Sequence, residues 1–251
     1  MIASPTIMKQ NPLILAEFER AFSEVDHDVV NILLHSLQNE LKLDNSTIDL
    51  FNCEQILDRK VLIRARKFKD HGKFGINANK DIFESLMKIK TTAAVIRNFT
   101  DIDGTFVKAK SISIIDDIRW IEAGHLEDKR EQSFEIQFNE WFLKVSTKNF
   151  NMLVGNFTNL SLGDTVDIKS KYAKKLYEIL KAKEYRETSF SLKYEDMQKL
   201  FNLEGKSFAY INQVLRRIKP MINNFIDFEY EVFKKDKLIS FKYNSKKVPL
   251  I

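Results

Sequence analysis

The segment from Ser207 to Phe225 constrains the fold of this chain more than any other stretch. Its apolar residues recur at intervals of three and four positions, at Phe208, Ile211, Leu215, Ile218, Ile222 and Phe225. That spacing predicts a helix with all of them on one face. The opposite face carries Asn212, Gln213, Arg216 and Arg217. Amide and guanidinium groups on an exposed helix face suit contact with the major groove of DNA. An ordinary amphipathic helix with a solvated polar face fits the same pattern.

The residues around this segment predict a series of short elements. Before it, the pattern indicates a helix at Lys169–Tyr185, a strand at Phe190–Leu192 and a helix at Tyr194–Phe201. After it, Ile226–Phe233 and Leu238–Asn244 alternate between apolar and polar residues, as paired strands do. The order of helix, strand, helix, helix and two-stranded hairpin is typical of a winged-helix DNA-binding domain.

The expected hairpin has a basic tip and an apolar face. Its apolar face would carry Ile226, Phe228, Tyr230 and Val232, with Ile239, Phe241 and Tyr243 as cross-strand partners. The tip is Lys234-Lys235-Asp236-Lys237. Lysines at such a tip protect the edges of a sheet from unwanted pairing, or they contact phosphate groups. A basic helix beside the tip favours phosphate contact.

The first half of the chain predicts a second set of elements in a similar order. They are a helix at Ser23–Leu43, a strand at Lys60–Phe68, a helix at Ile82–Ile96, strands at Phe106–Trp120 and Ser133–Phe138 around a charged loop at Glu127–Gln132, and a helix at Trp141–Leu153. This order is again close to that of a winged helix. The first half is therefore expected to be a second copy of the architecture, diverged beyond any visible sequence repeat.

We accordingly expect an α+β protein with two tandem winged-helix domains. Residues 1–20 hold two of the four prolines and are expected to form an N-terminal arm. The first domain would span 21–155. A stretch rich in Asn, Thr, Gly and Asp at 156–168 would link it to the second domain at 169–251.

Charge is distributed unevenly between the two halves. From Ile168 to the end, 19 Lys and Arg stand against 10 Asp and Glu, which is +9. The preceding residues hold the remaining 21 basic and 25 acidic side chains, which is −4. A basic region beside a mildly acidic one indicates a polyanion partner for the basic region.

Composition also bears on location. The single cysteine, Cys53, cannot form an internal disulfide and indicates a reducing compartment. Apolar runs fall short of the ~20 residues that span a bilayer. A cytoplasmic location without a membrane partner is expected.

The sequence lacks the patterns of common catalytic sites. The four histidines are scattered and show no metal-ligand spacing with Cys53. Gly205-Lys206-Ser207 resembles the end of a phosphate-binding loop, but the required glycine five residues earlier is Leu200. We therefore expect no metal, no cofactor and no catalytic residue.

Several motifs resemble the RepB/Rep_3 family of plasmid replication initiators. They are Ser170-x-Tyr172-Ala173-x-x-Leu176-Tyr177-Glu178, the helix end Ile218-Lys219-Pro220-x-Ile222-Asn223, and Phe134–Val145, which is similar to the segment closing the family's first winged helix. The resemblance spans roughly Lys60 to Tyr243 and is stronger in the C-terminal part.

This resemblance implies partners and a function. The C-terminal domain would bind repeated origin sequences (iterons) in double-stranded DNA through its long helix, and the protein would promote origin opening. The N-terminal domain would form homodimers in equilibrium with monomers, or bind adjacent DNA. Family members also interact with the host replication initiator and helicase, and dimers often repress their own promoter. Alternatives are a winged-helix transcriptional repressor without an initiator role and, from another class, a DNA nickase.

The resemblance and the charge pattern together nominate three groups of residues. Base contacts are expected from Ser207, Tyr210, Gln213, Arg216 and Arg217, although Tyr210 suits core packing equally well. Phosphate contacts are expected from Lys171, Lys174, Lys206, Lys234, Lys235 and Lys237. In the N-terminal domain, the candidates for DNA contact are Lys80, Lys88, Lys90 and Arg97.

Overall fold

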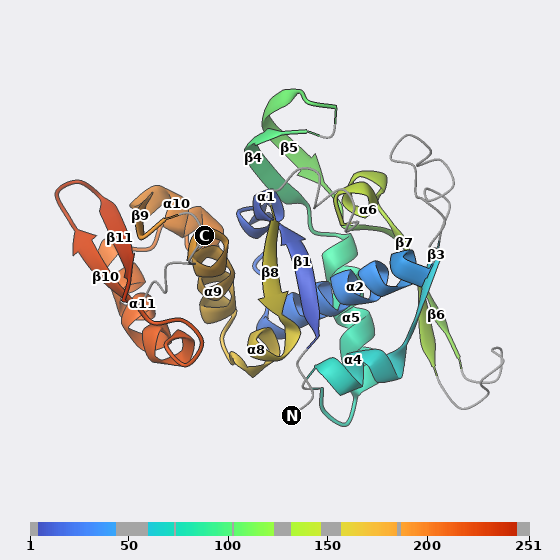
Figure 1. Ribbon diagram of the computed structural model, residues 1–251. Coiled ribbons are helices and arrows are strands. Elements are labelled where there is room, and N and C mark those ends of the chain that lie inside the picture. The colour runs from blue at the N-terminus through green and yellow to red at the C-terminus, as the bar shows by residue number, and fades with distance from the viewer. Residues whose placement is uncertain are drawn as a thin grey trace, which may run out of the picture.

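The computed structural model describes residues 5–43, 60–72, 74–101, 103–122, 132–146, 157–184 and 187–244. Their buried apolar side chains form two cores. The first core extends from Leu13 to Leu143 and includes Leu162. The second lies in the C-terminal part and also includes Ile7, Ile14 and Leu160. Figure 1 shows the two resulting units side by side.

The C-terminal unit contains the predicted helices and strands in their predicted order. Its elements are α9 (Lys171–Glu184), β9 (Ser189–Lys193), α10 (Tyr194–Leu200), α11 (Phe208–Ile222), β10 (Phe228–Phe233) and β11 (Leu238–Tyr243). The three strands form an antiparallel sheet in the order β10-β11-β9. Tyr230 pairs with Phe241, and Val232 pairs with Ile239, so the predicted register of the hairpin is confirmed.

Local sequence explains why α11 forms where it does. Ser207 caps the helix, because its side-chain oxygen accepts a hydrogen bond from the Tyr210 backbone N–H. Along the helix, Ile211, Val214, Leu215, Ile218 and Ile222 are buried against the second core. Pro220 lies within the helix on its exposed side.

The N-terminal unit repeats this connectivity. Its elements are β2 (Glu17–Phe18), α2 (Glu24–Leu43), β3 (Lys60–Arg64), α4 (Ala65–His71), α5 (Ala78–Lys90), β4 (Ala94–Thr100), β5 (Phe106–Ile112), β6 (Ile115–Ile121), β7 (Ser133–Phe138) and α6 (Glu140–Ser146). One sheet has the order β3-β7-β6. In both units, the strand that follows the first helix (β3 or β9) pairs with the last strand (β7 or β11). This last strand also pairs with the strand that precedes it in the hairpin (β6 or β10). The position of α11 in the C-terminal unit is therefore that of α5 in the N-terminal unit.

Three predicted elements of the N-terminal unit were wrong in extent or type. The helix expected to reach Ile96 ends at Lys90, and Ala94–Thr100 forms strand β4. Ala94 and Ile96 are buried on either side of a half-buried Val95, so this short run also fits a period of two. The strand expected at Lys60–Phe68 ends at Arg64, where α4 begins.

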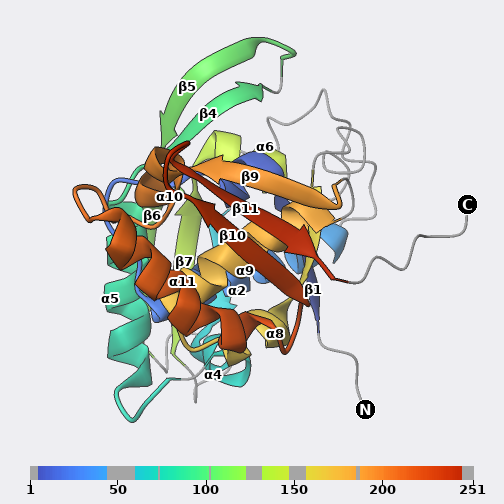
Figure 2. The ribbon, with the colours of Figure 1, turned by 90° about the vertical axis from the view of Figure 1, so that its left-hand side faces the viewer.

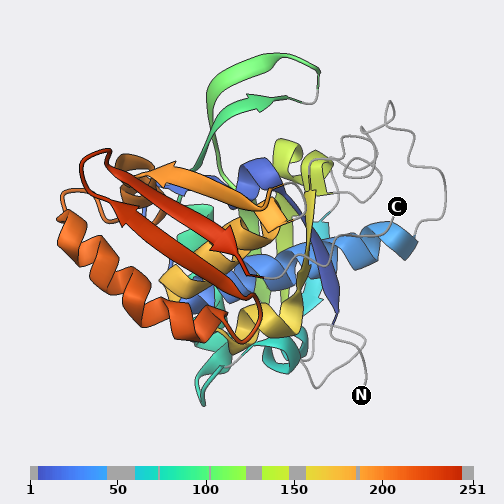
Figure 3. The ribbon, with the colours of Figure 1, turned by 60° about the vertical axis from the view of Figure 1, so that its left-hand side comes forward.

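The third error concerns the strand expected at Phe106–Trp120. It divides into β5 and β6, which belong to different sheets, and β4 with β5 forms a hairpin in the sheet β2-β4-β5. At the break, the Ser113 hydroxyl lies 2.9 Å from the carbonyl oxygens of Lys90 and Ile115. The β4–β5 hairpin is thus inserted between α5 and β6, and it projects from the body of the molecule (Figure 3).

The expected arm and linker are instead parts of one structure, which we call the seam. The seam consists of β1 (Thr6–Gln10), α1 (Asn11–Ile14), β8 (Phe157–Ser161) and α8 (Leu162–Asp167). Strands β1 and β8 pair in an antiparallel sheet between the two units (Figure 1). The prolines suggested an arm, but Pro12 lies in the first turn of α1, where its missing N–H costs no helical hydrogen bond. Ile7 and Ile14 are fully buried.

Several predictions fall on residues that the structure does not describe. They are most of the charged loop at Glu127–Gln132, the part of the Trp141–Leu153 helix beyond Ser146, and the expected boundary between 155 and 156.

Candidate nucleic-acid interface

The outer face of the C-terminal unit presents α11 beside the hairpin of β10 and β11 (Figure 2). Tyr210, Gln213, Arg216 and Arg217 are exposed on α11. The sequence of α11 contains no aspartate or glutamate. Four of the five predicted base-contacting residues therefore share one face, and that face is positive.

Arg216 and Arg217 lie on opposite flanks of this face, because consecutive helical residues are about 100° apart. On the flank toward the hairpin, the Tyr230 hydroxyl donates a hydrogen bond to Asn212 Oδ1 at 3.3 Å, and Arg216 lies near enough for its positive charge to act on the tyrosine. Lys219 forms an ion pair with Glu229 of β10. Burial raises the pKa of Tyr230, although Arg216 and Lys219 act in the opposite direction.

The other flank of α11 faces the start of α9. Burial and the neighbouring Tyr210 raise the pKa of Tyr172, and the positive charges of Arg217 and Lys206 oppose this shift. Lys206 lies 5.6 Å from the centre of the Tyr210 ring, and Lys171 lies 4.9 Å from that of Tyr172. Two lysines and two tyrosines are thus gathered on this flank, and the positive charge of Arg217, two turns further along α11, acts on the same flank. A cation over the face of an aromatic ring is attracted to it electrostatically.

Ser207, the fifth predicted base-contacting residue, is the N-cap of α11 and is exposed. Its hydroxyl oxygen is engaged with the Tyr210 backbone N–H at 3.2 Å. A hydroxyl can accept this bond and still donate its own proton.

The tip of the hairpin, residues 234–237, exposes all three of its lysines. Lys237 adopts a left-handed backbone conformation with φ of 50°. Its carbonyl oxygen accepts a hydrogen bond from the Tyr194 backbone N–H at 2.8 Å, so the tip is joined to the start of α10. The lysines consequently extend from an anchored turn at one side of the α11 face.

Lys174 was predicted to contact phosphate, and the structure contradicts this. Its side chain is 1% exposed and forms an ion pair with Asp28 of α2 and a hydrogen bond with the Thr165 carbonyl oxygen. The helical spacing that aligns Lys171 and Lys174 also places Lys174 and Lys175 against α2 and α1, where DNA has no access. Lys174 therefore leaves the set of candidate contacts.

Lys174 belongs to a buried polar cluster between α9, the seam and α2. Glu178 of α9 pairs with Lys9 of β1 at 2.8 Å and accepts a hydrogen bond from Asn31 at 3.2 Å. Lys175 donates to the carbonyl oxygens of Ile14 and Ala16 at 2.6 and 2.9 Å. Burial lowers the pKa of Lys175 to about 7, against the raising effect of Glu178. Charged side chains from both units and the seam thus satisfy one another.

The four candidates in the N-terminal unit each have an acidic partner. Lys80 pairs with Glu84, Lys88 with Asp26, Lys90 with Asp117 and Arg97 with Glu17. The exposed side of α5 carries Asp81 and Glu84 as well as Lys80. The structure does not gather these four residues on one face, since Arg97 lies on β4 and pairs across to β2.

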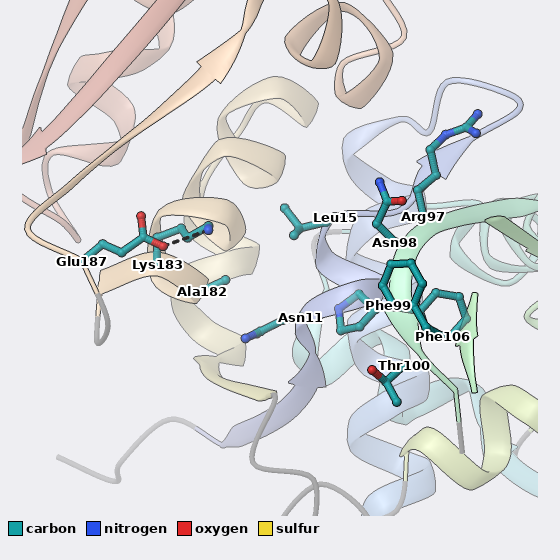
Figure 4. A pocket seen from close by; sticks show the side chains of 11 residues that line it. Asn11, Leu15, Arg97, Asn98, Phe99, Thr100, Phe106, Ala182, Lys183 and Glu187 are labelled. Atoms are coloured by element: carbon teal, nitrogen blue, oxygen red, sulfur yellow. Dashed lines mark hydrogen bonds and ion pairs between the residues drawn. The ribbon is translucent and has the colours of Figure 1, made fainter. Parts of the chain in front are cut away.

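A pocket of about 300 Å³ lies beside the seam. Figure 4 shows Ala182, Lys183 and Glu187 on one side of it and residues of α1, β4 and β5 on the other. Its charged side chains are already paired within the protein, Lys183 with Glu187 and Arg97 with Glu17. The pocket therefore has no surplus charge to hold an anionic ligand.

Two classes of site are not found among the described residues. Three or more His, Cys, Asp or Glu side chains do not come together there as a metal site requires. In the same part of the chain, the helices are too short or too polar to cross a membrane.

Tyr230 and Glu229 were not nominated from the sequence, and Asn212 was placed on the polar face of the helix but not among the base-contacting residues, although all three organise one flank of α11. Tyr230 was assigned only to the apolar face of its strand. The alternation of apolar and polar residues could have indicated that Tyr230 contacts α11, because the apolar face of the hairpin and α11 belong to the same core.

Solved structures share this fold at low sequence identity. The Pi initiator protein in complex with iteron DNA matches with a TM-score of 0.56 and 13% identity over 98% of this chain and 100% of that one. Domains 2 and 3 of RctB match with a TM-score of 0.51 and 9% identity over 98% of this chain and 89% of that one. No curated protein matches the sequence closely enough to count as a relative.

A family comparison gives the decisive match. The model described as "Initiator Replication protein, WH1" matches residues 6–181. That span begins at β1 and ends within α9, so it takes in the seam and the whole N-terminal unit. The protein belongs to the family of initiator replication proteins.

Proposed function

We propose that this protein initiates plasmid replication by binding tandem repeats of origin DNA through two tandem winged-helix domains. The C-terminal unit supplies the main base contacts by placing α11 in the major groove. The observation that carries this proposal is the acid-free exposed face of α11, with Gln213, Arg216 and Arg217. Arginine pairs bidentately with guanine and glutamine with adenine, and each pair discriminates by about 1–3 kcal/mol.

The lysines around this face position the domain on the DNA backbone. Lys171 and Lys206 lie at one end of α11, and Lys234, Lys235 and Lys237 form the hairpin tip. Phosphate contacts fix register and orientation without sequence preference. The likeness in fold to an initiator that was crystallised with iteron DNA supports the same mode of binding here.

Further steps follow from family membership and are part of the proposal. The bound protein promotes opening of the neighbouring origin DNA and recruits the host initiator and helicase. A homodimer in equilibrium with the monomer represses the protein's own promoter. The N-terminal unit mediates dimerisation or a second, weaker DNA contact.

Selection from a random DNA pool tests the central step. The full chain is incubated with randomised duplexes, and the bound fraction is sequenced and compared with the DNA flanking its gene. We expect one enriched motif that recurs as direct repeats about two helical turns apart, since repeated binding on one side of the DNA requires such spacing. An enriched palindrome without direct repeats would instead indicate a repressor. Absence of any enriched motif would contradict sequence-specific binding.

A further inference from the structure

Helix α5 and strand β6 of the N-terminal unit present three large apolar side chains beside one another. Phe83 and Met87 of α5 are one turn apart and lie on the same side of the helix. The Phe83 ring lies 5.2 Å from that of Trp120 on β6. Met87 and Trp120 are each 38% exposed, and Phe83 is partly buried against the first core. We call the surface formed by these three residues the α5–β6 surface.

The C-terminal unit contains an equivalent surface, formed by α11 and β10. In both units, a lysine near the end of the helix pairs with a carboxylate on the first strand of the hairpin. Lys90 of α5 pairs with Asp117 of β6 at 3.0 Å, and Lys219 of α11 pairs with Glu229 of β10. The two lysines therefore occupy corresponding positions, and they relate the residues of α5 to those of α11.

The corresponding residues of the two helices differ in chemistry. Phe83 and Asn212 each lie seven residues before the lysine of their helix. Met87 and Arg216 each lie three residues before it. Where α11 presents an amide and a guanidinium group, α5 thus presents a phenyl ring and a thioether. Single exposed apolar residues are ordinary on a protein surface, but adjoining ones mark a site of contact.

The charge that remains unpaired on α5 and β6 is negative. The basic side chains of these two elements all form ion pairs: Lys80 with Glu84, Lys88 with Asp26, Lys90 with Asp117 and Arg119 with Glu135. Three further carboxylates have no ion-pair partner among the described residues, and they are Asp81 on α5, Asp116 on β6 and Glu122 directly after β6. Surplus carboxylates repel the phosphate backbone of DNA.

An apolar surface with surplus negative charge fits a protein segment of complementary composition. An amphipathic helix docks by its apolar face, and basic residues that border this face would meet the carboxylates. A second copy of the same surface does not fit. A twofold contact would bring the carboxylates of the two copies together.

We propose that the α5–β6 surface is a docking site for a partner protein that presents an amphipathic helix with lysine or arginine beside its apolar face. This inference goes beyond the proposed function, because docking here does not require DNA. It assigns the N-terminal unit a protein contact at the position where the C-terminal unit contacts bases. Dimerisation and any DNA contact of the N-terminal unit are left to its other faces.

Two synthetic peptides test the docking site on the full chain. Each is a fluorescein-labelled amphipathic helix of ~18 residues with leucines along one face. In one peptide lysines border this face, and in the other glutamates replace them. Dissociation constants are measured by fluorescence anisotropy. The whole chain carries a net charge of +5, so attraction by overall charge would favour the glutamate peptide.

We expect the lysine peptide to bind about tenfold more tightly than the glutamate peptide, because only the lysines complement the carboxylates. M87A should weaken lysine-peptide binding about tenfold, since it removes an apolar side chain from the contact. D81N/D116N/E122Q keeps the apolar residues and should weaken the same binding about three- to tenfold, with a smaller dependence on salt. Equal binding of the two peptides, or wild-type affinity in both variants, would overturn the inference.

Phe106 provides a matched control, because it is 65% exposed on β5, outside the α5–β6 surface. F106A should change lysine-peptide binding by less than about twofold, as surface substitutions outside a contact do. Equal losses in F106A and M87A would show that the peptide adheres to exposed apolar residues in general. That result would also overturn the inference.

Two further measurements distinguish the other occupants. M87A should bind the enriched duplex, and a scrambled duplex of equal length and composition, as wild type does. Sedimentation velocity should give the same oligomeric state for M87A and wild type. Weaker DNA binding by M87A would assign the surface to DNA, and a shift toward monomer would assign it to a second copy, so either would overturn the inference. If wild type itself binds both duplexes equally, the proposed function fails, while the peptide measurements still decide the docking site.

Discussion

Helices α5 and α11 occupy the same position in two units of the same connectivity, yet their exposed faces differ in charge. The face of α11 combines Gln213, Arg216 and Arg217 with no acidic residue in the helix. That of α5 exposes Asp81 and Glu84, and Glu84 already pairs with Lys80. The units also differ in the segment that comes after the helix. A short turn leads from α11 to β10, whereas the β4–β5 hairpin is inserted after α5.

This difference indicates how two units of the same connectivity can contribute unequally to DNA binding. Connectivity alone places a helix beside a hairpin in both units. Binding to a polyanion depends further on charge that the protein does not neutralise itself. The C-terminal unit retains such charge on α11 and at the hairpin tip, and the N-terminal unit pairs its four candidate residues with carboxylates. We infer that the C-terminal unit provides most of the affinity for DNA.

The largest expected effect comes from replacing the two arginines of α11. R216A/R217A should weaken binding to the enriched duplex by about 2–6 kcal/mol, because each arginine contributes about 1–3 kcal/mol of discrimination. Anisotropy titration measures this. The matched variant in the N-terminal unit is K80A/R97A, which should change affinity by less than about threefold. Equal losses in the two variants would remove the distinction between the units.

The next effect concerns two lysines of α9. K174M breaks the buried ion pair between Lys174 and Asp28 and should reduce the free energy of unfolding by about 3–5 kcal/mol, as breaking a buried ion pair does. Urea denaturation measures it. K171A should change the free energy of unfolding by about 1 kcal/mol or less and weaken DNA binding, because Lys171 is only partly buried and its contact is with the Tyr172 ring. Unaltered stability of K174M would mean that the buried cluster does not hold the units together.

A smaller effect is expected at the hairpin tip. K234A/K235A/K237A should weaken binding to enriched and scrambled duplexes alike. The slope of log affinity against log salt should flatten by about 0.9 for each lysine–phosphate pair that the substitutions remove. The control variant K199A/K242A removes exposed lysines of the same unit outside the tip, and it should leave the slope closer to that of wild type. A selective loss on one sequence would show that the tip contacts bases.

The smallest effect tests whether charge alone separates the two helices. D81N/E84Q removes the exposed carboxylates of α5 and releases Lys80 from its partner. Affinity for the scrambled duplex should rise by roughly two- to fivefold, comparable to adding one phosphate contact at moderate salt. Affinity that stays at the wild-type value would indicate that α5 is kept from DNA by its surroundings and not by its charge.

Local patterns sufficed to predict the C-terminal unit, because each of its elements follows from neighbouring residues. The apolar spacing of α11, its serine cap and the alternation of β10 and β11 are all properties of short stretches. The family resemblance also anticipated the family that the chain belongs to. Predictions about individual DNA contacts stay predictions, apart from the one at Lys174.

Errors arose where a distant segment determines the local outcome. Lys174 meets Asp28, which lies 146 positions earlier, and the spacing of lysines on α9 cannot reveal this partner. Strand β1 owes its form to β8, far along the chain. At Ala94–Ile96, a short apolar run fits both helical and strand periods, and pairing with β5 decides between them.

The seam has a consequence for the order of folding. Its contacts join segments that are far apart in the chain, as in the hydrogen bond between Thr158 and Asn11, which are 147 positions apart. Closing such a loop costs entropy before it yields contacts, so distant pairing is a slow step. During synthesis, β1 leaves the ribosome long before β8 exists. Most of the N-terminal unit can fold in that interval, while β1 is still unpaired because β8 has not been synthesised. Association of the two units through the seam should therefore occur late in folding. In a refolding experiment followed by hydrogen exchange, the amides of β1 should become protected after those of β3, β6 and β7.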